Sequence, residues 1–142
     1  REPDLTPAQV KERLMMTAVP VLSIASKTAS SARANAFNAI TNTVPPTPAL
    51  GINVVRTNKK KLIIDGLGFR AGTTQIAVSG EVINKTIKFK SNYTLAGGTV
   101  TRMEVKLGKS LMRDTFPEGI QVTVTVFDTS TQESVSKQHV RF

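Results

Sequence analysis

After Gly51, apolar and polar side chains alternate along several segments of the chain. The segment from Gln121 to Val126 is QVTVTV, and the segment from Arg102 to Leu107 is RMEVKL. Successive side chains of an extended strand point to opposite faces, so each segment predicts a half-buried strand. The same period of two predicts inward positions for Ile52, Val54, Leu62, Ile64, Ile76, Val78, Ile83, Ile87, Phe89, Met103, Val105, Leu107, Ile120, Val122, Val124, Val126, Val140 and Phe142.

Turn-forming residues separate these segments at short intervals. Glycine, proline, serine and aspartate cluster at positions 66–72, 79–80, 97–98, 108, 117–119 and 128–131. About seven short strands separated in this way are typical of an antiparallel β-sandwich or a barrel. Because no segment of helical period is expected between them, residues 51–142 are predicted to form one all-β domain.

The first fifty residues follow a different pattern. A capping-box motif begins at Thr6, with Pro7 at the first helical position and Gln9 able to reach back to the cap. We therefore expect a short helix over about residues 7–16, ending before Pro20. A helix this short is stable only when one of its faces packs against another surface.

The rest of this region is an apolar extended segment (18–25), a weak second helix within 26–42 and a stiff proline-rich linker (44–48). Its apolar surface is too small for a core of its own. We expect residues 1–50 to form an arm that either lies across its own domain or contacts a neighbouring subunit. The expected contact residues are Val10, Leu14, Val19, Val21, Leu22, Ile24, Phe37 and Ile40, and those from Val19 to Ile24 could add to an exposed sheet edge.

Positive charge dominates the chain, with 19 Lys and Arg residues against 10 acidic residues and a net charge of +9. The densest cluster is Lys59, Lys60 and Lys61. These lysines could protect a strand edge from edge-to-edge aggregation, since charged side chains there disfavour pairing with another chain. Alternatively, they could contact an anionic partner. No aromatic RNA-binding motif, basic recognition helix or zinc finger accompanies these lysines, so the sequence disfavours nucleic-acid binding.

Residues that could carry catalysis or bind a metal are scattered. The chain has no cysteine and one histidine, His139, which is expected to face solvent in the last strand. Asp65, Asp114 and Asp128 each lie beside turn residues, where a carboxylate commonly binds nearby backbone. We therefore expect a protein that is not an enzyme, with no cofactor, no metal and no small-molecule substrate.

Two segments resemble the IPT/TIG type of immunoglobulin-like domain. The stretch from Lys61 to Gly80 has the family's strand, glycine–phenylalanine turn and second strand, and the stretch from Pro117 to Asp128 resembles its last hairpin. The resemblance covers about 90 residues and implies an immunoglobulin-like antiparallel β-sandwich. Family members serve as adhesion modules, enzyme appendages and parts of DNA-binding proteins, so no single activity is implied. The matching residues, expected to define the turns and core, are Gly66, Gly68, Phe69, Gly72 and Gly80.

These features favour a non-enzymatic structural or assembly subunit of a repeating structure. A virion capsid, tail or accessory protein and an extracellular filament both fit, so a virion or a cell surface is the expected location. The partners would be copies of the chain or other subunits, and no membrane-spanning helix is expected because no run of 18 apolar residues occurs. The alternative is an adhesion or carbohydrate-binding module, for which Tyr93 and the outward-phased Phe127 are candidate aromatic contacts.

Overall fold

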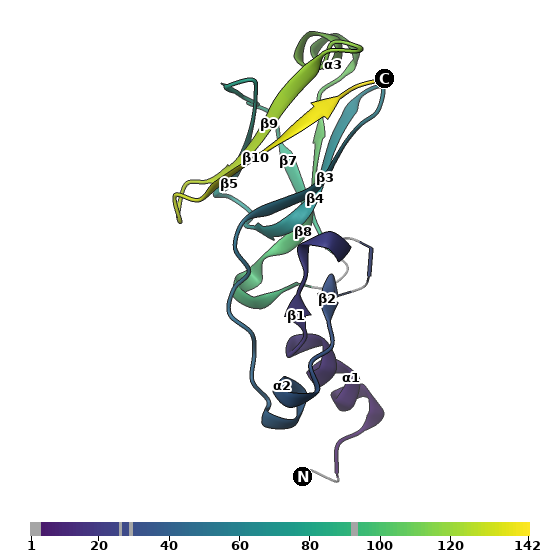
Figure 1. The fold of residues 1–142 in the computed structure, drawn as a ribbon, viewed down its shortest axis with the longest axis vertical. Helices are drawn as coiled ribbons and strands as arrows, with labels where there is room; N and C mark the ends of the chain where they lie inside the picture. The colour runs from purple at the N-terminus through teal and green to yellow at the C-terminus, as the bar shows by residue number, and fades with distance from the viewer. Residues whose placement is uncertain (1–3, 26, 29, 92–93) are drawn as a thin grey trace.

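The computed structural model describes residues 4–25, 27–28, 30–91 and 94–142 and is built mostly of antiparallel β-structure. Figure 1 shows an elongated molecule with two sheets at one end and the N-terminal helices at the other. One four-stranded sheet has the order β3 (Gly51–Thr57), β4 (Lys61–Phe69), β8 (Val100–Lys106), β7 (Ile87–Lys90). The other has the order β10 (Ser134–Val140), β9 (Gln121–Asp128), β5 (Thr74–Val78), β6 (Glu81–Val82). We call residues 51–142 the two-sheet body.

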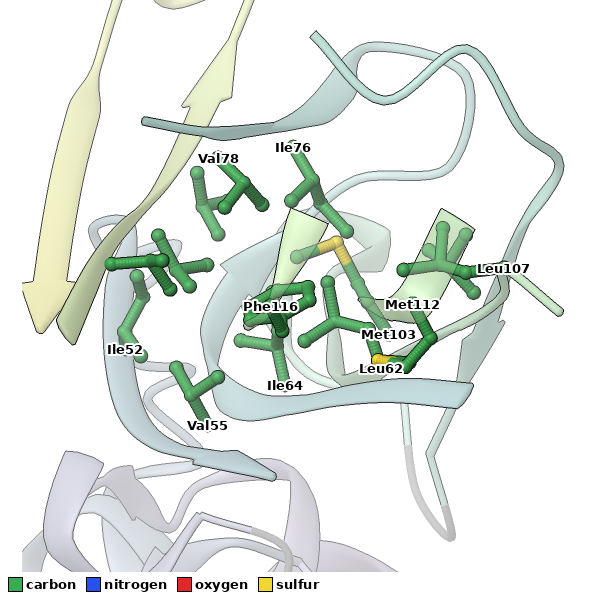
Figure 2. Packing of buried hydrophobic residues seen from close by; sticks show 14 of the residues in the cluster. Ile52, Val55, Leu62, Ile64, Ile76, Val78, Met103, Leu107, Met112 and Phe116 are labelled. Atoms are coloured by element: carbon green, nitrogen blue, oxygen red, sulfur yellow. The ribbon is translucent and has the colours of Figure 1, made fainter. Parts of the chain in front are cut away.

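The inner faces of the two sheets share one apolar core (Figure 2). Val122, Val124 and Val126 are buried as their alternation predicts, and Leu62 and Ile64 are buried opposite them in the other sheet. The antiparallel, mostly β part of the prediction is therefore confirmed. The described residues contain eight strands in these two sheets rather than about seven, and a further two in the arm.

The core differs from the sequence prediction in β3 and at the chain end. The register of β3 against β4 shifts between Ile52 and Val54, so Val55 is buried and Val54 is only half-buried. Ile120 is 56% exposed and Phe142 is fully exposed. The inward positions predicted for Val54, Ile120 and Phe142 are therefore wrong.

A helix that the sequence analysis did not predict closes one end of the core. α3 (Lys109–Thr115) lies between β8 and β9, and it buries Met112 and the adjoining Phe116 completely. In Figure 1 it lies at the end of the body opposite the arm. A short 3₁₀ turn, η2 (Ala96–Gly98), precedes β8.

The two sheets meet where β3 lies beside β10. A hydrogen bond of 3.0 Å joins Thr57 Oγ1 to His139 Nε2, and Lys137 Nζ donates to the carbonyl of Asn53 at 2.5 Å. The His139 ring is half-buried and lies edge-on to Phe116, with ring centroids 5.9 Å apart. The prediction that His139 faces solvent is therefore wrong, and the ring instead helps to close this seam.

The arm contains α1 (Pro7–Met16), β1 (Val19–Pro20), the 3₁₀ turn η1 (Leu22–Ile24), β2 (Ala32–Arg33) and α2 (Ala36–Thr41). The capping box at Thr6 is formed, and α1 occupies the range that the sequence predicts. The second helix is shorter than expected because the Asn35 side chain caps it, accepting from the Asn38 backbone at 3.1 Å.

The part of the arm around η1 packs against the chain's own two-sheet body. The Leu22 side chain lies against Gly51, and Ala25 packs with Leu67 and Leu95 in a small separate cluster. β1 pairs only with β2, in a two-stranded sheet of its own. Within the described residues, the segment from Val19 to Ile24 therefore adds no strand to an edge of its own body, and its addition to a sheet edge of a neighbouring subunit stays a prediction.

Candidate functional site

The tip of the arm exposes apolar side chains that no core in the arm covers. Neither α1 nor α2 has a buried residue. On α1, Val10 and Leu14 are each 42% exposed, one turn apart on the same face. On α2, Phe37 is 71% and Ile40 is 82% exposed. These four side chains, which we call the tip residues, present an apolar surface to solvent.

Polar contacts hold the two helices of the tip together. The side-chain amide of Asn38 donates to the carbonyl of Thr17 at 3.2 Å, and Thr17 Oγ1 donates to the carbonyl of Arg13 at 2.7 Å. Thr17 is fully buried beneath them. The tip therefore has a defined shape even though its apolar residues point outward.

The other four arm residues singled out from the sequence lie nearer to the two-sheet body and are less exposed. Val19, Val21 and Ile24 are half-buried, and Leu22 contacts Gly51. The structure thus divides the eight predicted contact residues into four beside the two-sheet body, of which Leu22 is still 37% exposed, and four that are more exposed at the arm tip. Sequence periodicity alone could not make this division.

Lys59, Lys60 and Lys61 lie at the turn between β3 and β4 and are all exposed. The Asn58 side chain shapes this turn, because its Oδ1 accepts from the backbone of Lys60 at 3.1 Å and of Lys61 at 2.8 Å. The three lysines are therefore presented on an ordered turn.

Asp65 lies in the middle of β4 and binds two arginines, not nearby turn backbone as the sequence suggested. It is 3% exposed, and Arg102 donates to it through Nε at 2.7 Å and a second nitrogen at 3.4 Å. Arg56 donates to the same carboxylate. Hydrogen bonding to Asp65 raises the pKa of Arg102. The two ion pairs join β3, β4 and β8 through one buried carboxylate, which is a structural role.

Asp128 organises the turn between β9 and β10. Its Oδ1 accepts from the backbone of Ser130 at 2.8 Å and of Thr131 at 3.1 Å, and its Oδ2 accepts from the hydroxyls of Thr73 and Thr74 at 2.8 and 3.0 Å. Burial opposes ionisation, but hydrogen bonds from Ser130, Thr73 and the backbone outweigh it and lower the pKa of Asp128. This carboxylate has the backbone-binding role that the sequence suggested.

The glycines of the IPT/TIG-like segment have two different roles. Gly68, Gly72 and Gly80 have positive φ, which glycine adopts without strain. Gly66 is needed for space, because a Cβ there would lie 2.0 Å from the carbonyl oxygen of Gly51 and 2.6 Å from the Phe69 ring. Phe69 itself is fully buried in the core.

A hollow of about 610 Å³ lies between β6 and α3. Its ionisable lining residues are Glu81, Lys85 and Asp114, and no described residue pairs with any of them. Within the described ranges, no three His, Asp or Glu residues gather in a way that could hold a metal ion. Nothing in the hollow forms a nucleophile–base pair of the kind that acyl transfer needs.

Of the two aromatic candidates for carbohydrate contact, only Phe127 lies within the described residues. Phe127 is half-buried, and Tyr93 lies outside the described residues. Every helix in the part of the chain that the structure describes is too short or too polar to cross a bilayer. The chain matches no known family model, and a search of curated proteins finds no match to it.

Proposed function

We propose that this chain is a non-enzymatic subunit of a repeating assembly and that its arm tip binds neighbouring copies. The observation that carries the proposal is the set of exposed tip residues on two helices that contain no buried residue. Burying an apolar side chain contributes about 1.5–3 kcal/mol, so helices with an uncovered apolar face gain stability when a partner covers them.

The size of this surface favours repeated contacts over a single tight one. Four partly exposed side chains contribute on the order of 4–8 kcal/mol when a partner buries them. Association costs roughly 4–15 kcal/mol in lost translational and rotational freedom, so one tip contact alone is weak. In a repeating assembly each subunit makes several contacts, and their combined strength exceeds that of any one.

The fold class that we propose for the two-sheet body is immunoglobulin-like, of the IPT/TIG type. In support, β3-β4-β8-β7 corresponds to the strand order A-B-E-D of an immunoglobulin sheet, and β10-β9-β5 corresponds to G-F-C. The two-residue β6 then takes the place of an additional C′ strand. Such bodies act as rigid building blocks, which suits a virion component or an extracellular filament.

Sedimentation velocity on the full chain tests the proposed assembly role. Wild type is expected to show a weight-average mass that rises with concentration, and Val10→Ser/Leu14→Ser is expected to stay monomeric. Val82→Ser/Ile120→Ser is the matched control, because Val82 is 45% and Ile120 is 56% exposed on the two-sheet body. A monomeric wild type, or equal loss in both variants, would contradict the proposal.

A further inference from the structure

Strand pairing brings two lysines from distant sequence to the Lys59–Lys61 turn. In the register of β4 with β8, Lys61 lies directly opposite Lys106. The carbonyl of Lys60 accepts from the backbone nitrogens of Leu107 and Gly108 at 2.9 and 3.1 Å, and Lys109 follows at once. We call Lys59, Lys60, Lys61, Lys106 and Lys109 the lysine cluster.

The positive charge of this cluster is poorly compensated. All five lysines are exposed, and none forms an ion pair with another residue in the described ranges. The nearest acid on β8 is Glu104, two residues before Lys106. Lys90 already donates to it at 2.9 Å, and Lys61 interacts with it through space without forming an ion pair. Like charges directly opposite each other in a sheet repel, so the Lys61–Lys106 pair gains from an added anion.

The chemistry of the cluster indicates which anion fits. On the same sheet the buried carboxylate of Asp65 is held by the planar forks of two arginines, whereas the cluster contains only lysines. Lysine binds phosphate as a mobile point charge, and duplex DNA carries about one phosphate charge per 1.7 Å of helix axis, so a cluster of five lysines can neutralise several phosphates at once. The apolar neighbour Leu107 is buried, so the cluster lacks the apolar centre of a protein interface.

We propose that the lysine cluster binds the phosphate backbone of nucleic acid without reading its base sequence. The sequence disfavoured nucleic acid because no recognition motif accompanies the lysines, but backbone binding requires only clustered cations. The cluster lies by α3, at the end of the body opposite the arm tip (Figure 1), so both surfaces can be occupied together. This inference is independent of the proposed assembly role.

Fluorescence anisotropy with a labelled 20-base-pair DNA duplex tests the proposal. Five neutralised phosphates give a slope of about −4.5 for log K against log salt, or a loss of about 500-fold between 50 and 200 mM NaCl. Replacing three of the lysines (Lys59→Gln, Lys106→Gln, Lys109→Gln) leaves two contacts. The slope is then about −1.8, and the loss over the same range is about 12-fold.

A variant of equal charge separates this site from general electrostatic attraction. Lys11→Gln/Lys27→Gln/Lys85→Gln changes three exposed lysines elsewhere, and both triple variants lower the net charge from +9 to +6 (16 cations against 10 acids). The control is expected to keep the wild-type slope. Equal slopes for the two variants, or wild-type binding weaker than about 1 mM at 50 mM NaCl, would overturn the proposal.

A labelled twenty-residue poly-glutamate peptide is the second probe, since it carries carboxylates instead of phosphates. We expect it to bind wild type at least about tenfold more weakly than the DNA at 50 mM NaCl, since duplex DNA carries charge at a high density along its axis and releases condensed counterions on binding. Equal or tighter binding of the peptide would assign the cluster to an acidic protein partner and refute a nucleic-acid site.

Discussion

Replacing Asp128 by asparagine removes one charge from the turn between β9 and β10 and leaves the side-chain shape almost unchanged. Oδ1 can keep its hydrogen bonds from the Ser130 and Thr131 backbone. An amide nitrogen at the Oδ2 position, however, faces the hydroxyls of Thr73 and Thr74, which now donate to Oδ2. Hydrogen bonds to a charged group contribute about 1.5–3 kcal/mol each, and Thr74 is buried where water cannot replace the loss.

Arg70 adds to the cost of this change. Its NH1 is buried without a hydrogen-bond partner in the described residues and lies 3.8 Å from the Asp128 carboxylate. Allowing for partial reorientation of the two hydroxyls, we expect Asp128→Asn to lower the free energy of unfolding by about 2–4 kcal/mol at pH 7. In an Arg70→Met background the cost should fall by about 0.5–1 kcal/mol or more, because the two groups interact directly.

The pH dependence provides a second, independent readout. The pKa of Asp128 is lowered in the folded state, so the unfolded chain takes up the proton first as pH falls through about 4. The stabilisation is complete above that pH and is lost as pH falls further, so wild type and variant should converge. Urea unfolding followed by far-UV circular dichroism suits a chain without tryptophan. A variant within about 0.5 kcal/mol of wild type at pH 7, or a difference unchanged at pH 3, would refute this reasoning.

Two further substitutions test local packing. Gly66→Ala should prevent folding of the body, because its Cβ would lie 2.0 Å from the Gly51 carbonyl oxygen, whereas Gly72→Ala should cost only about 1–2 kcal/mol of backbone strain, since nothing lies within 4 Å of that Cβ. Equal circular dichroism spectra and melting temperatures for the two variants would contradict this. Burial lowers the pKa of His139, so wild type should lose stability as pH falls below about 6.5, and His139→Gln, which keeps a partner for Thr57, should lose less. Identical losses between pH 7 and 5 would show that His139 is not responsible.

The alternating strands could be predicted from the sequence because burial of every second side chain is a local property. Val122, Val124 and Val126 are buried as predicted, but the pattern fails at Ile120 and Phe142. The last residue pair in the ladder of β9 and β10 is Gln121 with Val140. Ile120 and Phe142 therefore lie beyond the end of the sheet, where no second layer covers them.

The sequence analysis did not predict α3 because its seven residues make only two helical turns, too few to show a clear helical period between two strongly alternating strands. The sequence pattern that could have indicated this helix is Met112 and Phe116, which are four residues apart and are followed by Pro117. Both side chains are fully buried, so tertiary packing and not helix propensity holds this segment.

The charged sites depend on strand register, which the sequence does not contain. The glycine after Asp65 predicts a turn at this position, yet Asp65 lies within β4, directly opposite Arg102 in β8. The same register places Lys106 beside Lys61. The lysine run was visible from the sequence, but the five-lysine cluster was not.

Site-specific photo-crosslinking at the arm tip shows whether this surface contacts a second copy of the chain. A benzophenone amino acid in place of Phe37, which is 71% exposed, leaves the fold intact because no core contact is lost. On irradiation of the purified full-length chain, we predict covalent dimers and larger species, with peptides from a second copy joined to position 37. The same label in place of Lys88, which is exposed on β7 of the two-sheet body, should give none. A chain that stays monomeric after irradiation, or that crosslinks equally from both positions, would contradict the account.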